Sequence, residues 1–229
     1  MKRIGLVGGT GPESTKEYYM GIIRKCKLFN YPEIIIYSVN MSEIMKLQEA
    51  GGWEAASFKL IEVIKRLEKA GAEFGAICAN TPHIVFDSVQ ESVKIPLVSI
   101  VDATLNKGTE VGVKKPLLLG TKWTMEADFF PEKFKKAGIE IVVPDSIDGA
   151  MVHRYIFKEL ERGKFKPETK QWFVDLVKQY QEQQGVDSVI LGCTELPLLF
   201  TQEDLDVPAL DTTDIHIDAI YEMANADDR

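Results

Sequence analysis

Short runs of aliphatic and β-branched residues alternate along the chain with longer amphipathic stretches. This alternation is typical of βαβ units, in which each parallel strand is buried on both faces and leads into a helix. The pattern predicts an α/β fold with mainly parallel sheets flanked by helices. The strands that it predicts are Arg3–Val7, Glu33–Ser38, Phe74–Cys78, Leu97–Ile100, Pro116–Leu119, Ile139–Val143 and Ser188–Leu191.

Two of the amphipathic stretches predict helices with clear ends. In Glu54–Ala70 the apolar residues recur at a spacing near 3.6, and Gly71 follows as a C-terminal cap. Glu168–Gln184 has the same periodicity and ends in the same way at Gly185.

The two halves of the chain repeat one pattern. A strand runs into Gly-Thr at Thr10 and again at Thr121, and a later strand runs into a polar turn at Thr81 and again at Thr194. The two pairs are separated by 111 and 113 positions, from 10 to 121 and from 81 to 194. These similar separations indicate a duplicated unit, and therefore two pseudo-symmetric Rossmann-like halves.

The duplication predicts where the domains and the site lie. We expect the chain to cross near Asp102–Thr109 and to return near Val207–Asp211, which gives a first domain of 1–102 plus 207–229 and a second of 103–206. The last helix, Asp214–Ala224, is expected to pack on the first half. Because ligands of open α/β sheets bind beyond the carboxyl ends of the strands, we expect a site in a cleft between the halves. The turns expected there are Gly8–Thr15, Ala79–His83, Gly120–Thr124 and Gly192–Glu195.

Composition narrows the class of protein. The 229 residues are 45% hydrophobic and carry a formal charge of −8, which disfavours binding to nucleic acid. No stretch resembles a signal peptide or approaches the roughly 20 apolar residues of a membrane span. We therefore expect a soluble, cytoplasmic protein that has neither nucleic acid nor a membrane as a partner.

Cysteines and histidines supply the first candidates for chemistry. Cys26, Cys78 and Cys193 are too few and too scattered for a disulfide framework or a CxxC metal site, so reduced thiols are expected. His153 and His216 show no metal-ligand spacing with Cys or carboxylates. We interpret both histidines as structural or surface residues and expect no metal.

Two segments could act on a ligand. Gly8–Thr15 joins a strand to a helix and can hold a small anion such as a carboxylate, although a tight turn without a ligand is the alternative. It is no dinucleotide fingerprint, because Ser14 stands where the third glycine would be. Cys193 follows an apolar strand near a predicted helix start, which would lower the pKa of its thiol. The alternative is a buried structural cysteine. His83 could act as a general acid or could cap a helix and orient Asn80.

Three segments together resemble the aspartate/glutamate racemase family over essentially the whole chain. Each is weak alone, but their order and spacing are specific. They are Gly8-Gly9-Thr10-Gly11-Pro12, Ala79-Asn80-Thr81-Pro82-His83 and Leu191-Gly192-Cys193-Thr194-Glu195.

The resemblance implies an amino-acid racemase that needs neither PLP nor a metal, built from two pseudo-symmetric α/β domains and forming a homodimer. Family members use two cysteines, one per domain, to remove and return the α-proton from opposite faces. The residues that it implies in binding a small carboxylate or amino-acid substrate are Gly9, Thr10, Asn80, Thr81, His83, Thr121, Thr124, Thr194 and Glu195.

The sequence departs from the family at two places. Cys193 matches the second cysteine, but Ala79 occupies the position of the first, so Cys78, Thr81 or water would have to replace its thiol. Side chains alternate along a strand, which predicts that the Cys78 thiol points away from the site. The basic residues that grip a side-chain carboxylate in aspartate racemases also lack secure counterparts. Lys46, Arg162 and Lys164 are the candidates.

Three functions are consistent with these residues. The leading hypothesis is racemisation of aspartate or glutamate with Cys193 as one base. A single cysteine also resembles the arrangement in arylmalonate decarboxylases of the same superfamily, where one thiol protonates an enediolate. The third hypothesis is a non-catalytic module that binds a carboxylate metabolite.

Overall fold

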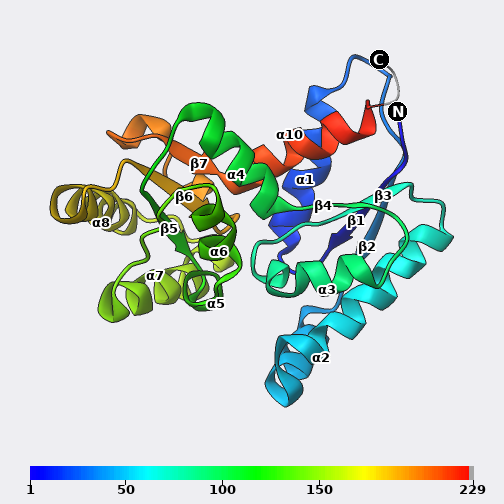
Figure 1. Cartoon of the computed structure of the whole chain (residues 1–229), viewed down its shortest axis with the longest axis horizontal. Coiled ribbons are helices and arrows are strands. Elements are labelled where there is room, and N and C mark those ends of the chain that lie inside the picture. Colours follow the sequence, from blue (N-terminus) through cyan, green and yellow to red (C-terminus); the bar gives the residue numbers. More distant parts are fainter. Residues whose placement is uncertain (227–229) are drawn as a thin grey trace. The chain divides into compact units, whose positions relative to one another are not determined.

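The computed structural model in Figure 1 describes residues 1–226, in which strands and helices alternate as the hydrophobic pattern predicts. The chain forms two compact units. The first comprises Met1–Ala103 and the segment from Thr213 onward, and the second comprises Thr104–Thr212. Two helices contain the unit boundaries, α4 (Ile100–Val111) and α10 (Thr212–Ala224).

The first unit contains a four-stranded parallel sheet in the order β2-β1-β3-β4. Val7 of β1 pairs with Ile77 of β3, so the turns after these two strands lie at the same edge of the sheet. The elements of this unit before α4 are β1 (Ile4–Gly8), α1 (Pro12–Lys25), β2 (Ile34–Ser38), α2 (Met41–Lys69), β3 (Phe74–Ile77), η1 (Thr81–Val85), α3 (Phe86–Glu91) and β4 (Leu97–Val98).

Apolar side chains cover both faces of this sheet, as expected for parallel strands. Val7 and Ile77 pack on one face against α2, in a cluster that includes Leu60. Leu6 packs on the other face against α1 and α10, in a cluster that includes Ile220. Figure 1 shows α1 and α10 side by side, so the last helix packs on the first half as predicted.

Helix α2 extends further than the sequence pattern indicated. The predicted helix Glu54–Ala70 forms its second part, and a shorter helix precedes it from Met41. Gly51 and Gly52 break the helical backbone between the two parts, with φ of −151° and 69°. Gly71 has φ of 101°, a conformation that favours glycine and that ends the helix where the pattern predicted.

The second unit contains a three-stranded parallel sheet in the order β5-β6-β7. Gly120 of β5 pairs with Gly192 of β6, which aligns the turns after these strands. The elements of this unit are β5 (Pro116–Gly120), α5 (Lys122–Glu126), α6 (Phe129–Lys136), α7 (Ser146–Lys158), η2 (Leu160–Arg162), α8 (Pro167–Gln184), β6 (Ser188–Gly192), α9 (Leu196–Leu199), η3 (Gln202–Asp204) and β7 (Ala209–Asp211).

The strand predicted at Ile139–Val143 is reduced to a single bridge, in which Val142 pairs in parallel with Leu117. Pro144 follows closely and lacks the N–H group that a continuing strand would need. This bridge lies beside β5 as β2 lies beside β1, so the two sheets share one strand order. The shared topology is that of two pseudo-symmetric α/β halves.

The sequence predicted that the chain returns to the first domain at residue 207, whereas the segment that rejoins the first unit begins at Thr213. Residues Ala209–Asp211 form β7, which pairs with β6, and therefore belong to the second unit. Three residues are too short a run for hydrophobic alternation to reveal, so the pattern missed this strand. No helix within residues 1–226 is long and apolar enough to cross a membrane.

Candidate active site

The turn after β1 has an imposed backbone conformation. Gly9 has φ of 86°, and a Cβ at this position would lie 2.4 Å from the carbonyl oxygen of Val39. Its N–H donates a hydrogen bond of 2.8 Å to Thr15 Oγ1. The hydroxyl of Thr10 is buried and has no hydrogen-bond partner among residues 1–226. A buried hydroxyl without a partner is costly, so Thr10 is suited to meet a polar ligand.

The turn after β3 lies beside the turn after β1. Ser14 Oγ donates a buried hydrogen bond of 2.8 Å to the carbonyl oxygen of Cys78 and so joins the two turns. Ala79 and Thr81 are partly exposed, whereas Asn80 is buried. The structure thus brings together the candidate residues of the first unit at one sheet edge.

His83 is locked between two backbone groups. The Ile100 N–H donates to its Nε2 across 3.2 Å, so this nitrogen carries no proton. Its Nδ1 lies 2.8 Å from the carbonyl oxygen of Ala79 and must donate to it. The ring is 3% exposed. A neutral, buried ring with both nitrogens engaged supports the positioning role of His83 rather than general acid catalysis.

Cys78 does not replace the missing thiol. Its side chain is fully buried on the α1 side of the sheet, among residues that include Phe74 and Ile217. This burial raises the pKa of the Cys78 thiol. The alternation of side chains along the strand predicted this orientation, and the proposal that Cys78 substitutes is not supported.

The second unit repeats the arrangement at its own sheet edge. Thr121 caps α5, and its Oγ1 accepts the Thr124 N–H at 3.3 Å. The two threonine hydroxyls lie 3.2 Å apart, and Thr124 is fully buried against Gly120. Thr124 therefore shapes the turn, and Thr121 lies nearer to the surface than Thr124 does.

A thiol and a carboxylate meet in the turn after β6. Cys193 Sγ donates a hydrogen bond of 2.9 Å to Glu195 Oε2, and the Thr194 hydroxyl donates to the same oxygen at 2.9 Å. Both Cys193 and Glu195 are buried, with 7% and 8% of their surface exposed. Burial and the hydrogen bond to Glu195, whose carboxylate is also held by Thr194, fix the thiol at the sheet edge.

The environment of Cys193 raises the pKa of its thiol well above the usual value. Burial is the main cause, and the negative charge of Glu195 adds to it. The sequence predicted that a helix N-terminus would lower the pKa of this thiol. That prediction was wrong, because the helix that follows, Leu196–Leu199, has a single turn. The resting cysteine is therefore a protonated thiol.

Glu161 is a further acidic group near this pair that the sequence motifs did not single out. Desolvation of its carboxyl raises its pKa to about 7, and the charge of Glu195 contributes to the same shift. Its own charge also disfavours the Cys193 thiolate. No local spacing identifies Glu161, since it lies 32 positions before Cys193 in the sequence.

The remaining candidates lie outside these turns, although the His216 ring packs edge-on against His83 with ring centroids 5.9 Å apart. His153 accepts the Lys122 N–H at 3.1 Å, and His216 is a fully buried residue of α10. Lys46 is exposed on α2, and Arg162 and Lys164 are exposed in and after η2. Among the described residues, no group of three His, Cys, Asp or Glu side chains could hold a metal ion.

The site chemistry follows from these contacts. The second unit offers a thiol that can exchange a proton with a neighbouring carboxylate, and both units offer polar turns at the carboxyl edges of their sheets. Two duplicated parallel α/β units, one with a buried thiol hydrogen-bonded to a carboxylate, offer groups of the kind that general acid–base catalysis uses.

Comparison with known proteins assigns the chain to one family. The sequence profile described as Asp/Glu/Hydantoin racemase matches residues 7–220, and the chain belongs to this family of racemases. An aspartate racemase homologue from Pyrococcus horikoshii OT3 is 46% identical, with a TM-score of 0.87 over 98% of this chain and 100% of that chain.

More distant relatives are also racemases by name. The broad specificity amino-acid racemase RacX of Bacillus subtilis (strain 168) is 24% identical over 92% of this chain and 92% of its own length. The aspartate racemase of Picrophilus torridus is 23% identical and has the same fold, with a TM-score of 0.78 over 98% of this chain and 95% of that one.

Proposed function

We propose that this protein racemises an amino acid, aspartate or glutamate, without a cofactor and with Cys193 as an acid–base group. The observation that carries the proposal is the Cys193 thiol hydrogen-bonded to Glu195 at the carboxyl edge of a parallel sheet. Membership of a racemase family supports the reaction type.

The proton transfers can be written so that each proton is accounted for. Glu195 accepts the proton of the Cys193 thiol across their 2.9 Å hydrogen bond. The resulting thiolate removes the α-proton of the amino acid, which breaks the Cα–H bond, forms an S–H bond and leaves a planar carbanion. Hydrogen bonds to the substrate carboxylate stabilise this carbanion. A proton from a donor on the opposite face inverts the centre, and the base that this leaves takes up the proton held by Glu195 through solvent, so that thiol, carboxylate and donor are all restored.

The second face needs a donor other than a thiol. Ala79 has no exchangeable proton, and Cys78 is buried in the core of the first unit. Water or the partly exposed hydroxyl of Thr81 therefore delivers this proton in the proposed reaction. Because the same group must remove the α-proton in the reverse reaction, a weaker donor on one face predicts racemisation that is slow from both enantiomers.

Substrate recognition is assigned to the polar turns. The unpartnered Thr10 hydroxyl and the turn at Gly9 are suited to hold the α-carboxylate, together with Asn80. In the second unit, Thr121 and Thr194 are likewise assigned to substrate binding. Relatives named aspartate racemase, and one named for broad specificity, support amino acids as the substrate class. A homodimer and a cytoplasmic location are proposed from the family resemblance and the composition.

A substrate panel tests this proposal. The purified protein is incubated in deuterium oxide with L- and D-aspartate, L- and D-glutamate and L-alanine, and α-hydrogen exchange and inversion are followed by proton NMR and chiral chromatography. Exchange with inversion is expected for an acidic amino acid. Loss of carbon dioxide from a substituted malonate without amino-acid exchange would instead favour the single-cysteine decarboxylase, and ligand binding without either reaction would favour a binding module.

A further inference from the structure

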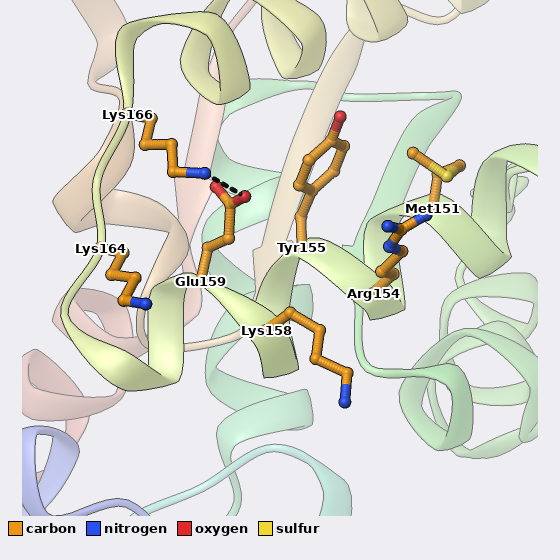
Figure 2. Close-up of a pocket in the computed structure, with 7 residues that line it drawn as sticks. All are labelled: Met151, Arg154, Tyr155, Lys158, Glu159, Lys164 and Lys166. Carbon is orange, nitrogen blue, oxygen red and sulfur yellow. Dashed lines mark hydrogen bonds and ion pairs between the residues drawn. The ribbon is translucent and has the colours of Figure 1, made fainter.

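A surface pocket of about 520 Å³ lies on the second unit, apart from the residues assigned above to the turns around Cys193. Figure 2 shows its lining side chains on helix α7 and on the segment that follows it. Its volume is in the range of pockets that hold small molecules. The residues that line it are Met151, Arg154, Tyr155, Lys158, Glu159, Lys164 and Lys166.

The only carboxylate of this lining is already engaged. Glu159 accepts hydrogen bonds from Lys166 Nζ at 2.7 Å and from Thr169 Oγ1 at 2.6 Å. These two donors lower the pKa of Glu159, so it stays ionised. Figure 2 shows the pair of Lys166 and Glu159 at one side of the pocket. Lys166 is the cation that Glu159 binds directly, and the charge of Lys164 acts on the same carboxylate only at longer range.

Three cations of the lining have no ion-pair partner within residues 1–226, namely Arg154, Lys158 and Lys164. What sets them apart from other exposed cations is that they line one pocket whose only carboxylate, Glu159, is bound to Lys166. Arg154 and Lys158 come from one face of α7, because residues four apart on a helix are neighbours. A concave surface lined by one sign of charge concentrates ions of the opposite sign.

The remaining lining residues give the pocket a fixed wall. The ring of Tyr155 packs against Trp172, with ring centroids 5.0 Å apart, and against Phe173 at 6.0 Å. These contacts hold the tyrosine in place, so one side of the pocket is preformed. A preformed site lowers the entropic cost of binding.

We propose that this pocket binds a small oxyanion that carries two or more negative charges, of the class of phosphate esters and pyrophosphate. Arg154 supplies paired N–H donors that match the oxygens of such a group. Lys158 and Lys164 add point charges in its lining. Anion binding in this pocket can be tested separately from the racemase reaction, because the experiment measures binding without turnover.

The test is binding of pyrophosphate to the purified protein by isothermal titration calorimetry. We expect saturable binding with one site per chain, and weaker affinity as ionic strength rises. The double variant Arg154→Gln/Lys158→Gln removes two cationic donors and should bind about 10-fold or more weakly, which is a loss of about 1.4 kcal/mol or more in binding free energy.

The control removes the same charge elsewhere in the unit. The double variant Lys135→Gln/Lys136→Gln changes two exposed lysines of α6 that do not line the pocket, and it should keep the wild-type affinity. Absence of saturable binding, or an equal loss of affinity in both double variants, would overturn the proposal. Binding that disappears when Cys193 is alkylated would also overturn it, because the anion would then occupy the catalytic residues instead.

Discussion

The thiol of Cys193 donates a 2.9 Å hydrogen bond to the carboxylate of Glu195, two residues further along the chain. This contact has two opposite consequences. Glu195 disfavours the thiolate, because two negative charges repel, and it also offers an acceptor for the thiol proton. The resting site is thus uncharged on sulfur and is prepared for proton transfer.

Replacement of Glu195 by glutamine should therefore make Cys193 more reactive toward alkylation. The carboxylate raises the pKa of the thiol, so Glu195→Gln lowers that pKa and increases the thiolate fraction at a given pH. We expect carbamidomethylation of Cys193 at pH 8 to become several-fold faster, measured by peptide mass spectrometry. Cys26 is the internal reference and should react equally in both proteins. An unchanged or slower rate at Cys193 would contradict the assigned effect of Glu195.

Installation of a thiol at position 79 should increase racemisation. Ala79 is partly exposed, so a side chain one atom larger can be accommodated. A well-placed general acid or base contributes about 100-fold or more, and we expect Ala79→Cys to raise the rate of racemisation from both enantiomers at least about 10-fold in chiral chromatography assays. Ala79→Ser is the matched control, since it adds a similar volume without a thiol. Equal effects of both variants would show that the thiol is not the missing group.

Changes at His83 should affect stability more than they affect the pH profile. His83→Ala leaves the Ala79 carbonyl and the Ile100 N–H without their partners. A buried polar group without a partner costs about 1 to 3 kcal/mol, so we expect a loss of about 2 to 4 kcal/mol in urea unfolding. His83→Asn, which can still donate to the Ala79 carbonyl, should recover part of this loss. The pH profile of α-hydrogen exchange should keep its shape in both variants. Loss of one limb of that profile would indicate a general acid.

The turn after β1 should accept no side chain at Gly9. Gly9→Ala places a Cβ 2.4 Å from the Val39 carbonyl oxygen and strains a backbone with φ of 86°. We expect a loss of at least about 3 kcal/mol in urea unfolding. Gly185→Ala is the control, because Gly185 has φ of 69° with open space around it. Its backbone strain alone should cost about 1 to 2 kcal/mol. Equal losses of unfolding free energy in the two variants would mean that the structure shifts to relieve the close approach to Val39.

Much of the fold could be predicted because its strands are buried on both faces. The mainly apolar runs at Arg3–Val7 and Pro116–Leu119 predict buried strands. Gly71 and Gly185 adopt the positive φ that favours glycine, and they follow the predicted helix ends. The strand at Ile139–Val143 could not be assigned correctly, because pairing at a sheet edge depends on tertiary contacts that a local pattern does not contain. β7 was missed because it is too short.

The candidate site was predictable only in part. The positions of the polar turns follow from strand ends, and Ala79 could be singled out because the resemblance to the racemase family implies a cysteine at its position. The state of Cys193 could not be predicted, because its pKa depends on burial and on the orientation of Glu195. Glu161 was missed because its influence acts through space, from a segment that carries no motif.

The most direct test of the central claim compares the wild-type protein with Cys193→Ser in deuterium oxide. Both proteins are incubated with each enantiomer of aspartate and glutamate, and loss of the α-proton signal is followed by NMR. Circular dichroism confirms that the variant is folded. We predict α-hydrogen exchange by the wild type and a rate at least about 100-fold lower in Cys193→Ser, because a hydroxyl is a far weaker acid than a thiol. Equal exchange by the folded variant, or no exchange by the wild type with any of these amino acids, would contradict the assignment of Cys193 as the acid–base group of a racemase.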